Sequence, residues 1–556
     1  MKIPKYSIFL LILIVFSFIT RIYRINNLSL FGDEIDVGYQ AYSILNTGKD
    51  YKGNLLPTYI QSLSESRAPL LIYLSIPGIK IFGLTQLGVR ITPIIFSILS
   101  IFLVYKLVLL LSKSDKLALI SATVMSFTPW HFHYSRTSFE VTLLISLILS
   151  GTYFIFKYFD NNKNKFLYLS ILFFCLSFYT YNTANIFVPL LILFIFFTNL
   201  SKFKSSLKPK SIFFSSLIFL IVTVPLLSQI FFGNAANRFG LINIFNDPKI
   251  VNNIVEKRTS FSATVPNIEK IFHNKPISWI QEFTKNYLNA FSLPFLFNHG
   301  DINNLRHSVP NFGLIFVSFL PFLFIGLFSL DLKLKLNKLM LFWLITSPVA
   351  TSLTTNGGNH ATRLFILLPA ICFFIGNGIY KLLSSPKITS KIIVSVLMTT
   401  AIFETISYSH EYFVHYPKDS FEVWNYGYQE IFQNIPVNSS RVFISNAKYN
   451  SLLPFVFYQK YKSTTPLQDQ EVKNIIYNLD GFKLDQKIYF INNWKNNDVI
   501  SQITKISQPK DTFILFQGKD IPGDWNLTQN PISSFNTIKT IFNPNKTILA
   551  QIIQKQ

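Results

Sequence analysis

Long apolar runs dominate the chain and limit its possible folds more than any other feature. Eleven largely apolar stretches follow one another between positions 6 and 408. A helix of about 20 apolar residues is long enough to cross the hydrocarbon core of a membrane. We therefore predict an all-α polytopic membrane protein with about 11 transmembrane helices, at residues 6–22, 91–111, 117–133, 138–159, 166–181, 184–200, 211–232, 311–330, 339–355, 362–383 and 391–408.

The composition agrees with this class. Half of the 556 residues are hydrophobic and only 14% are charged, whereas about a quarter of a soluble protein is charged. This difference argues against a soluble enzyme, a disordered chain and a coiled coil. The two cysteines, Cys175 and Cys372, both lie inside apolar runs, which excludes a disulfide framework and a cysteine-ligated metal site.

The lysines predict how the chain is threaded. They gather in every second short connection, around positions 113, 163, 204, 335 and 387, as expected for cytoplasmic loops. We therefore predict a protein of the cell membrane with a cytoplasmic N-terminus. Its extracytoplasmic segments are then residues 23–90, 233–310 and 409–556. The net charge of +23 then follows from topology and contact with membrane lipids, so we expect no nucleic-acid partner.

Two domains are expected. Residues 1–408 form the transmembrane domain, and the character of the chain changes after them. Short apolar runs such as 441–445, 487–491 and 512–516 are separated by Asn, Asp, Gly and Pro, a pattern typical of strands and turns. Residues 409–556 are therefore predicted to form a small extracytoplasmic α/β domain.

Arginine and lysine are distributed differently. On the predicted threading, none of the ten arginines lies in a cytoplasmic loop. The planar guanidinium suits bidentate binding of phosphate or carboxylate groups. The outer side is therefore where we look for chemistry, although chance among ten residues is the alternative.

Two adjacent carboxylates, Asp33 and Glu34, follow the first apolar run. The residues after them have a helical apolar pattern, so Asp33 could cap a helix with Asp36 as its capping-box partner. Alternatively, a carboxylate at the level of the lipid headgroups can accept a proton from a hydroxyl group. The two roles are compatible.

A series of motifs in the first 200 residues resembles the GT-C membrane glycosyltransferases. The similarity is greatest to the group that contains the protein O-mannosyltransferases and the lipid A aminoarabinose transferases. It rests on Asp33-Glu34, Tyr39, Ala41-Tyr42, Gly48-Lys49-Asp50-Tyr51, Arg67 before Pro69-Leu70, Phe82-Gly83, Val89-Arg90, the segment 126–136 and Glu140, and more thinly on 299–307 and 360–363.

The resemblance implies a sugar donor carried on polyprenyl phosphate and used at the extracytoplasmic face. It also implies that Asp33 is the essential acidic residue of the first outer loop, that Arg136 contacts the lipid phosphate, and that Glu140 is the usual second acidic residue. The chain departs from the family at Arg67-Ala68-Pro69, where Lys-Pro-Pro or Glu-Lys-Pro is common. The C-terminal segment does not resemble a β-trefoil, so the acceptor stays open between glycan, lipid and protein.

Each of the remaining polar residues of the outer side allows two interpretations of its role. Arg136 and Glu140 either face a cavity or form a local ion pair. His360 and Arg363 either bind an anion at a helix start or anchor the interface. His131 and His133 fit an aromatic belt at the membrane interface, and their spacing does not provide a convincing set of metal ligands. Whether the protein uses a divalent cation stays open. Further candidates are Glu65, Arg67 and Arg90 for the substrate, and His299, Asp301, Arg306 and His307 for the acceptor side.

The sequence therefore predicts an inverting hexosyl- or pentosyltransferase that depends on a polyprenyl-phosphate sugar. Asp33 deprotonates an acceptor hydroxyl, and Glu34 assists or orients it. Arg136, helped by Arg67 or Arg363, stabilises the leaving phosphate. The alternatives are a transporter or a flippase for lipid-linked glycans, which would carry polar residues near the bilayer midplane, and a glycan polymerase or ligase.

Overall fold

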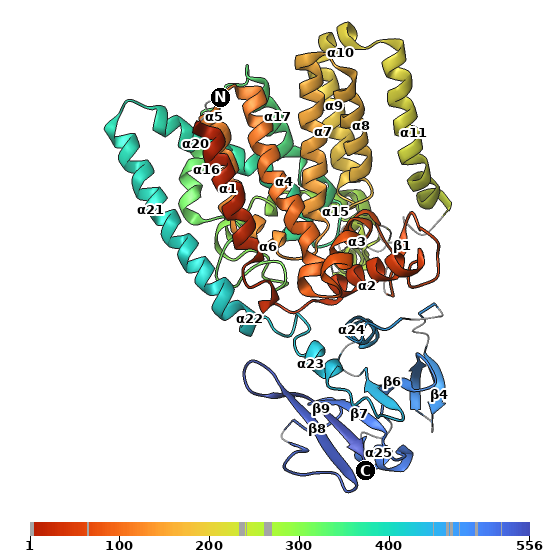
Figure 1. The fold of residues 1–556 in the computed structure, drawn as a ribbon. Helices are drawn as coiled ribbons and strands as arrows, with labels where there is room; N and C mark the ends of the chain where they lie inside the picture. Colours follow the sequence, from red (N-terminus) through yellow and green to blue (C-terminus); the bar gives the residue numbers. More distant parts are fainter. Residues whose placement is uncertain are drawn as a thin grey trace.

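The computed structural model describes residues 5–556 except 64–65, 233–239, 241, 261–269, 447, 449, 463–465, 468–470, 477–478, 495–498 and 524. Long helices form one part of the molecule, and a smaller part built around a sheet lies beyond one end of them (Figure 1). The predicted class, a polytopic helical protein with a small C-terminal α/β domain, is confirmed. The boundary at residue 408 stays a prediction.

Every predicted apolar run contains helix. The helices concerned are α1 (Lys5–Ile22), α4 (Gln86–Ser112), α5 (Asp115–Phe127), α7 (Val141–Asn161), α8 (Asn164–Ser177), α9 (Ala184–Thr198), α11 (Pro209–Phe232), α16 (Leu320–Phe328), α17 (Lys335–Thr346), α20 (Leu368–Ser384) and α21 (Ile388–His410). Among the described residues, 6 helical segments are long and apolar enough to cross a membrane, or 7 if α9 and α10 (Leu200–Ser206), bent by 79°, count as one span. The number eleven stays a prediction.

The expected span at residues 117–133 is divided into two helices. The run 117–133 was predicted as a single helix, but α5 ends at Phe127 and the short helix α6 (Pro129–Ser135) follows. Thr128 has extended backbone angles, as the residue before a proline prefers. The break at Pro129 turns the chain before it reaches Arg136 and Glu140.

Small residues allow close helix packing in the bundle. A Cβ atom on Gly326 of α16 would lie 1.8 Å from the carbonyl oxygen of Phe374, and one on Gly378 of α20 would lie 2.0 Å from that of Phe322. The two backbones are therefore in direct contact, which is typical of helices that associate within a membrane.

The two ends of the bundle differ in charge. The lysine-bearing connections, including α4–α5 at Lys113 and α20–α21 at Lys387, lie at the end that is uppermost in Figure 1. The opposite end carries α2 (Gly32–Thr47), α3 (Leu70–Phe82) and the sheet domain. This separation agrees with the predicted threading. Which end faces the cytoplasm stays a prediction.

The described residues of the sheet domain form seven strands in the order β4-β5-β6-β3-β7-β9-β8. Strands β6 (Ile488–Asn493), β3 (Val442–Ser445) and β7 (Thr512–Phe516) are parallel, and their neighbours are antiparallel: β4 (Val472–Ile476), β5 (Leu479–Lys483), β8 (Phe535–Phe542) and β9 (Ile548–Lys555). Helix α24 (Leu452–Tyr458) packs against α2. The sheet domain therefore contacts the segment that carries Asp33.

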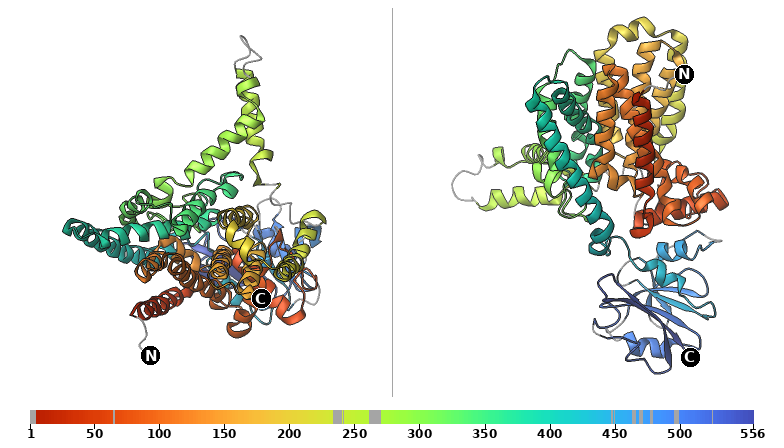
Figure 2. Two further views of the ribbon diagram at one scale, coloured as in Figure 1. Left: turned by 90° about the horizontal axis from the view of Figure 1, so that it is seen from above. Right: turned by 60° about the vertical axis from the view of Figure 1, so that its left-hand side comes forward.

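A pair of helices projects sideways from the bundle between α11 and α16. Helices α13 (Pro248–Ser260) and α15 (Lys275–Asn289) extend away from the other helices in both views of Figure 2. After α15 the chain passes through the π-helical turn Pro294–Asn298 into a loop with Asp301 and His307, and it returns to the bundle at Val317. This return path brings the loop next to α19 (Ala361–Leu364).

Candidate active site

A cavity of about 340 Å³ lies at the end of the bundle that carries α2 and α3. Its volume is within the range of about 300–1,000 Å³ that is usual for small-molecule sites. Its wall is formed by residues 66–68, the start of α7, the connection from α8 to α9 with the first turn of α9, and the region of α18 (Val349–Ser352) and α19, together with Tyr59 and Ile242. Its charged lining residues are Arg67, Glu140 and Arg363, and its neutral polar ones include Tyr59, Thr180, Tyr181, Asn182, Asn185 and Thr351.

Arg67 lies at the centre of three carboxylates. Its guanidinium nitrogens lie 3.1 Å from Asp33 Oδ1, 3.2 Å from Asp36 Oδ2 and 3.9 Å from Glu140 Oε1. The side chain is 5% exposed, and the short strand β2 (Ser66–Arg67) pairs with β1 (Ile60–Gln61), which fixes its backbone. Arg67 thus connects the segment after the first helix to the cavity wall.

Asp36 is buried and supports Arg67 from behind. The Tyr51 hydroxyl donates to Asp36 Oδ1 at 2.7 Å, and the Arg67 Nε lies beside the other carboxylate oxygen. Burial raises the pKa of Asp36, and the Arg67 charge opposes this rise. Because Asp36 is held from both sides, it restricts the positions that the Arg67 guanidinium can adopt.

Asp33 is the accessible carboxylate of the group. Its side chain is 52% exposed, and Arg67 holds its Oδ1. The alternative that Asp33 caps the helix is wrong, because α2 starts at Gly32 after Phe31, and the third helical residue, Glu34, accepts from the Phe31 N–H. Asp33 does not line the cavity itself, but its partner Arg67 does.

Glu34 is completely buried and paired with Arg90. The Arg90 Nε and Nη2 donate to the two Glu34 oxygens at 2.8 and 2.6 Å, and the Ser138 N–H donates to Oε1 at 2.8 Å. Arg90 is 1% exposed, and its Nη1 also donates to the carbonyls of Ile25 and Leu28. Of the two expected roles for Glu34, this geometry allows orientation of Asp33 and not contact with an acceptor. Arg90 likewise has no access to the cavity.

Arg136 is placed differently from the expectation. It is 2% exposed, and its nitrogens donate to the carbonyls of Thr20, Arg21 and Arg24 at the end of α1. It does not line the cavity and does not pair with Glu140, which lies near Arg67 instead. The sequence could not show this because the partners of Arg136 are backbone atoms more than 100 positions away.

Of the pair expected at a helix start, only Arg363 reaches the cavity. Its Nη1 donates to Thr354 Oγ1 at 2.7 Å. The N–H of Ala361, where α19 begins, is already bonded to Asp301 Oδ2 at 3.1 Å. That N–H is therefore occupied by Asp301, and His360 lies outside the cavity lining. Anion binding at this helix start stays a prediction.

The two histidines that were expected in an aromatic belt, His131 and His133, lie inside the protein. His131 and His133 are buried, and they bond respectively to Arg21 and Ser100, and to the Arg306 carbonyl. Asp301, His307 and His360 come together as one group, which the sequence did not predict. His299 is exposed and lies outside it, and Arg306 stacks over Phe31. Glu65 lies outside the described residues.

Sequence reasoning missed the neutral wall of the cavity. Tyr181 and Asn182 come from the connection between α8 and α9, and Asn185 lies in the first turn of α9. The signal was present, because this connection and the first turn of α9 hold the run Thr180-Tyr-Asn-Thr-Ala-Asn185 on the predicted outer side between two apolar stretches. Polar residues grouped at a helix end are candidates for ligand contact.

Comparison with protein-family models gives a match for part of the chain. Residues 66–228 match the family model described as dolichyl-phosphate-mannose-protein mannosyltransferase. This segment holds Arg67, Glu140 and the connection between α8 and α9, and therefore much of the cavity wall. A search among proteins of curated function finds no significant match.

Comparison with solved structures covers the whole chain. The crystal structure of ArnT from Cupriavidus metallidurans bound to undecaprenyl phosphate matches with a TM-score of 0.56 and 11% identity, covering 98% of both chains. Its apo form matches with a TM-score of 0.52 and 10% identity over 99% of this chain and 98% of that one. The archaeal oligosaccharyltransferase AglB from Archaeoglobus fulgidus gives 0.48 and 14% over 81% of this chain and 64% of that one. The expected resemblance in fold is confirmed.

Proposed function

We propose that this GT-C glycosyltransferase of the ArnT-like type transfers a sugar from a polyprenyl-phosphate donor to an acceptor hydroxyl, with inversion at the anomeric carbon. The observation that carries the proposal is the position of Arg67. It lines the cavity and at the same time holds the exposed carboxylate of Asp33. A carboxylate that can act as a base, Asp33, is thus in direct contact with a cation of the cavity wall, Arg67.

Asp33 is the residue that we assign as the general base. Arg67 holds its Oδ1, and we assign Oδ2 to the hydroxyl of the acceptor. As Asp33 takes the proton, the hydroxyl oxygen attacks the anomeric carbon, and the polyprenyl phosphate leaves with the electron pair of the broken bond. The transition state has oxocarbenium character, as in glycoside hydrolysis. A single displacement inverts the configuration.

Arg363 and Arg67 are the cations that we assign to the leaving phosphate. Both line the cavity, and arginine suits bidentate contact with phosphate oxygens. Negative charge grows on these oxygens during the reaction, so preorganised cations in a site shielded from water lower the barrier. Arg136 and Arg90 are left out of this role because their donors are bonded to backbone carbonyls and to Glu34.

Two further observations support the donor and the location. The ArnT structure that shares this fold was solved with undecaprenyl phosphate. The cavity lies at the end of the bundle opposite the lysine-bearing connections, which is the extracytoplasmic side under the positive-inside rule. We infer that the enzyme is in the cell membrane with a cytoplasmic N-terminus, and we place a transporter role second because the matching family model describes a transferase.

The test uses one substitution at Asp33 and a matched control. Asp33→Asn should keep the fold and lower transfer by about 10²–10⁴-fold, because the amide cannot accept the proton. Asp160→Asn removes a similar carboxylate, 49% exposed and 3.7 Å from Lys113, at the far end of α7, and should transfer at the wild-type rate. Membranes containing each variant are supplied with a panel of polyprenyl-phosphate sugars, and product formation and anomeric configuration are measured. Transfer by Asp33→Asn at the wild-type rate would refute the assignment.

A further inference from the structure

We propose that Asp301, His307 and His360 bind one divalent transition-metal ion, with zinc as the best match. The site would connect the second outer loop to the start of α19. The proposal does not depend on the transfer reaction, since none of the three residues lines the cavity.

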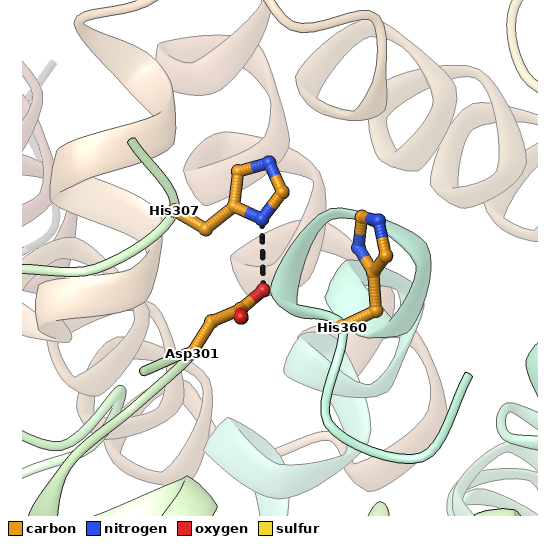
Figure 3. A group of neighbouring side chains, drawn as sticks. All are labelled: Asp301, His307 and His360. Carbon is orange, nitrogen blue, oxygen red and sulfur yellow. Dashed lines mark hydrogen bonds and ion pairs between the residues drawn. The ribbon is translucent and has the colours of Figure 1, made fainter. Parts of the chain in front are cut away.

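The three side chains present their donor atoms to one small space. The donor atoms all lie within 4.8 Å of one another, and Asp301 Oδ2 is 2.8 Å from His307 Nδ1. The ring centroids of His307 and His360 are 4.9 Å apart, with an angle of 35° between the rings. Figure 3 shows both rings on the same side of the Asp301 carboxylate. Zinc ligands lie about 2.0–2.2 Å from the ion, so a small rotation of the side chains closes the remaining gap.

The charge at Asp301 supports a cation. This carboxylate is 4% exposed, and within the described part of the chain no lysine or arginine is ion-paired with it. Its Oδ2 accepts instead from His307 and from the Ala361 N–H. A buried carboxylate is costly unless a positive charge or several hydrogen bonds compensate for it. A divalent ion bound by Asp301 and two neutral imidazoles provides that charge.

The donor set and its surroundings select the kind of metal. Two imidazoles and one carboxylate suit zinc and related transition metals better than magnesium or calcium, which prefer oxygen. Outer contacts hold the ligands: Asn304 Nδ2 lies 3.3 Å from His307 Nε2, and the Asp301 N–H donates to Ser308 Oγ at 2.9 Å. Such contacts orient metal ligands. On binding, the ion would replace the Nδ1 proton of His307, and the neutral imidazole would then carry its proton on Nε2.

The site would have a structural effect on the cavity. Asp301 and His307 come from the loop after α15, whereas His360 directly precedes α19, which carries Arg363. Metal binding at these three residues would fix this loop to the cavity wall without contact between the ion and the substrate.

The experiment measures metal binding by the purified full-length protein in detergent. After loading with Zn²⁺ and desalting, the wild type should retain about one zinc per chain. His360→Ala and Asp301→Asn should bind Zn²⁺ at least about tenfold more weakly, with unchanged elution in size-exclusion chromatography. His299→Ala is the matched control, because His299 is exposed, lies in the same loop and is not in the group. A Co²⁺-loaded sample should show visible d–d absorption that His360→Ala lacks.

Two results would overturn the proposal. The first is a wild-type protein that retains neither Zn²⁺ nor Co²⁺, which would leave Asp301 and His307 as an ordinary hydrogen-bonded pair. The second is His360→Ala with wild-type stoichiometry and affinity, which would place the ion elsewhere.

Discussion

Replacing each of the adjacent carboxylates Asp33 and Glu34 by the matching amide should affect a different property of the protein. Glu34→Gln removes the negative charge that compensates Arg90, in a pair whose side chains are 0% and 1% exposed. Breaking a buried ion pair on one side costs about 3–5 kcal/mol, because the remaining charge stays buried. Asp33 is half exposed and, among the described residues, is ion-paired with Arg67; loss of such a pair costs about 0–1 kcal/mol. Glu34→Gln should therefore lose stability, and Asp33→Asn should lose turnover.

The assay separates folding from catalysis. Each variant is heated in detergent, and the folded fraction is followed by fluorescence-detected size-exclusion chromatography. Transfer is then measured per folded molecule at a temperature where both variants are folded. A double-mutant cycle with Arg90→Gln gives the coupling between the two side chains, which should be large because they are in direct contact.

One outcome would refute this reasoning. If Glu34→Gln unfolds at the wild-type temperature and its transfer per folded molecule falls as far as that of Asp33→Asn, Glu34 takes part in the chemistry. The buried pair with Arg90 would then not describe the working enzyme. Weaker expression of Glu34→Gln alone does not decide the matter, and for this reason the rate is normalised to folded protein.

Two further predictions concern Arg136 and the sheet domain. Arg136→Lys keeps the charge but loses the planar guanidinium that donates to three carbonyls. The free energy of unfolding should therefore fall by about 1.5–3 kcal/mol, while the KM for the donor stays constant. A raised KM with normal stability would instead support contact between Arg136 and the donor phosphate. Burial raises the pKa of Asp520 from 3.8 to about 6, so the neutral carboxyl stabilises the fold. This contribution to the free energy of unfolding is about 3 kcal/mol. It is fully present below pH about 4 and is lost as the pH rises through about 6. Asp520→Asn should flatten the pH dependence of unfolding measured for the sheet domain by hydrogen exchange, and an unchanged profile would contradict this.

The fold followed from the sequence because the bilayer imposes a length and a polarity on each helix. The apolar runs and the lysine-bearing connections were sufficient to place helices and to separate the two ends of the bundle. The break at Thr128-Pro129 was legible in the same residues, since a proline disfavours helix in the residue before it. The seven-stranded order of the sheet domain was not predictable, because pairing between β3, β6 and β7 depends on contacts distant in sequence.

The site was predictable only in part, because hydrogen-bond partners determine what a charged residue does. Asp33, Arg67, Glu140 and Arg363 lie in or beside the cavity, and the sequence singled out all four. The group of Asp301 and His360 was not found, since its members are separated by 59 positions and meet only through the return path of the second outer loop.

The arginines of the predicted outer side have a second physical role besides anion binding. The residues after the first helix have carbonyl groups that their own helix cannot satisfy. Arg90 bonds the carbonyls of Ile25, Leu28 and Ser29, and Arg136 bonds those of Thr20, Arg21 and Arg24. Five fixed donors allow one arginine to reach several carbonyls, which a lysine ammonium cannot do in the same geometry. Arginine is therefore needed here twice: Arg90 and Arg136 fix the chain that leads to Asp33, and Arg67 and Arg363 supply charge to the cavity.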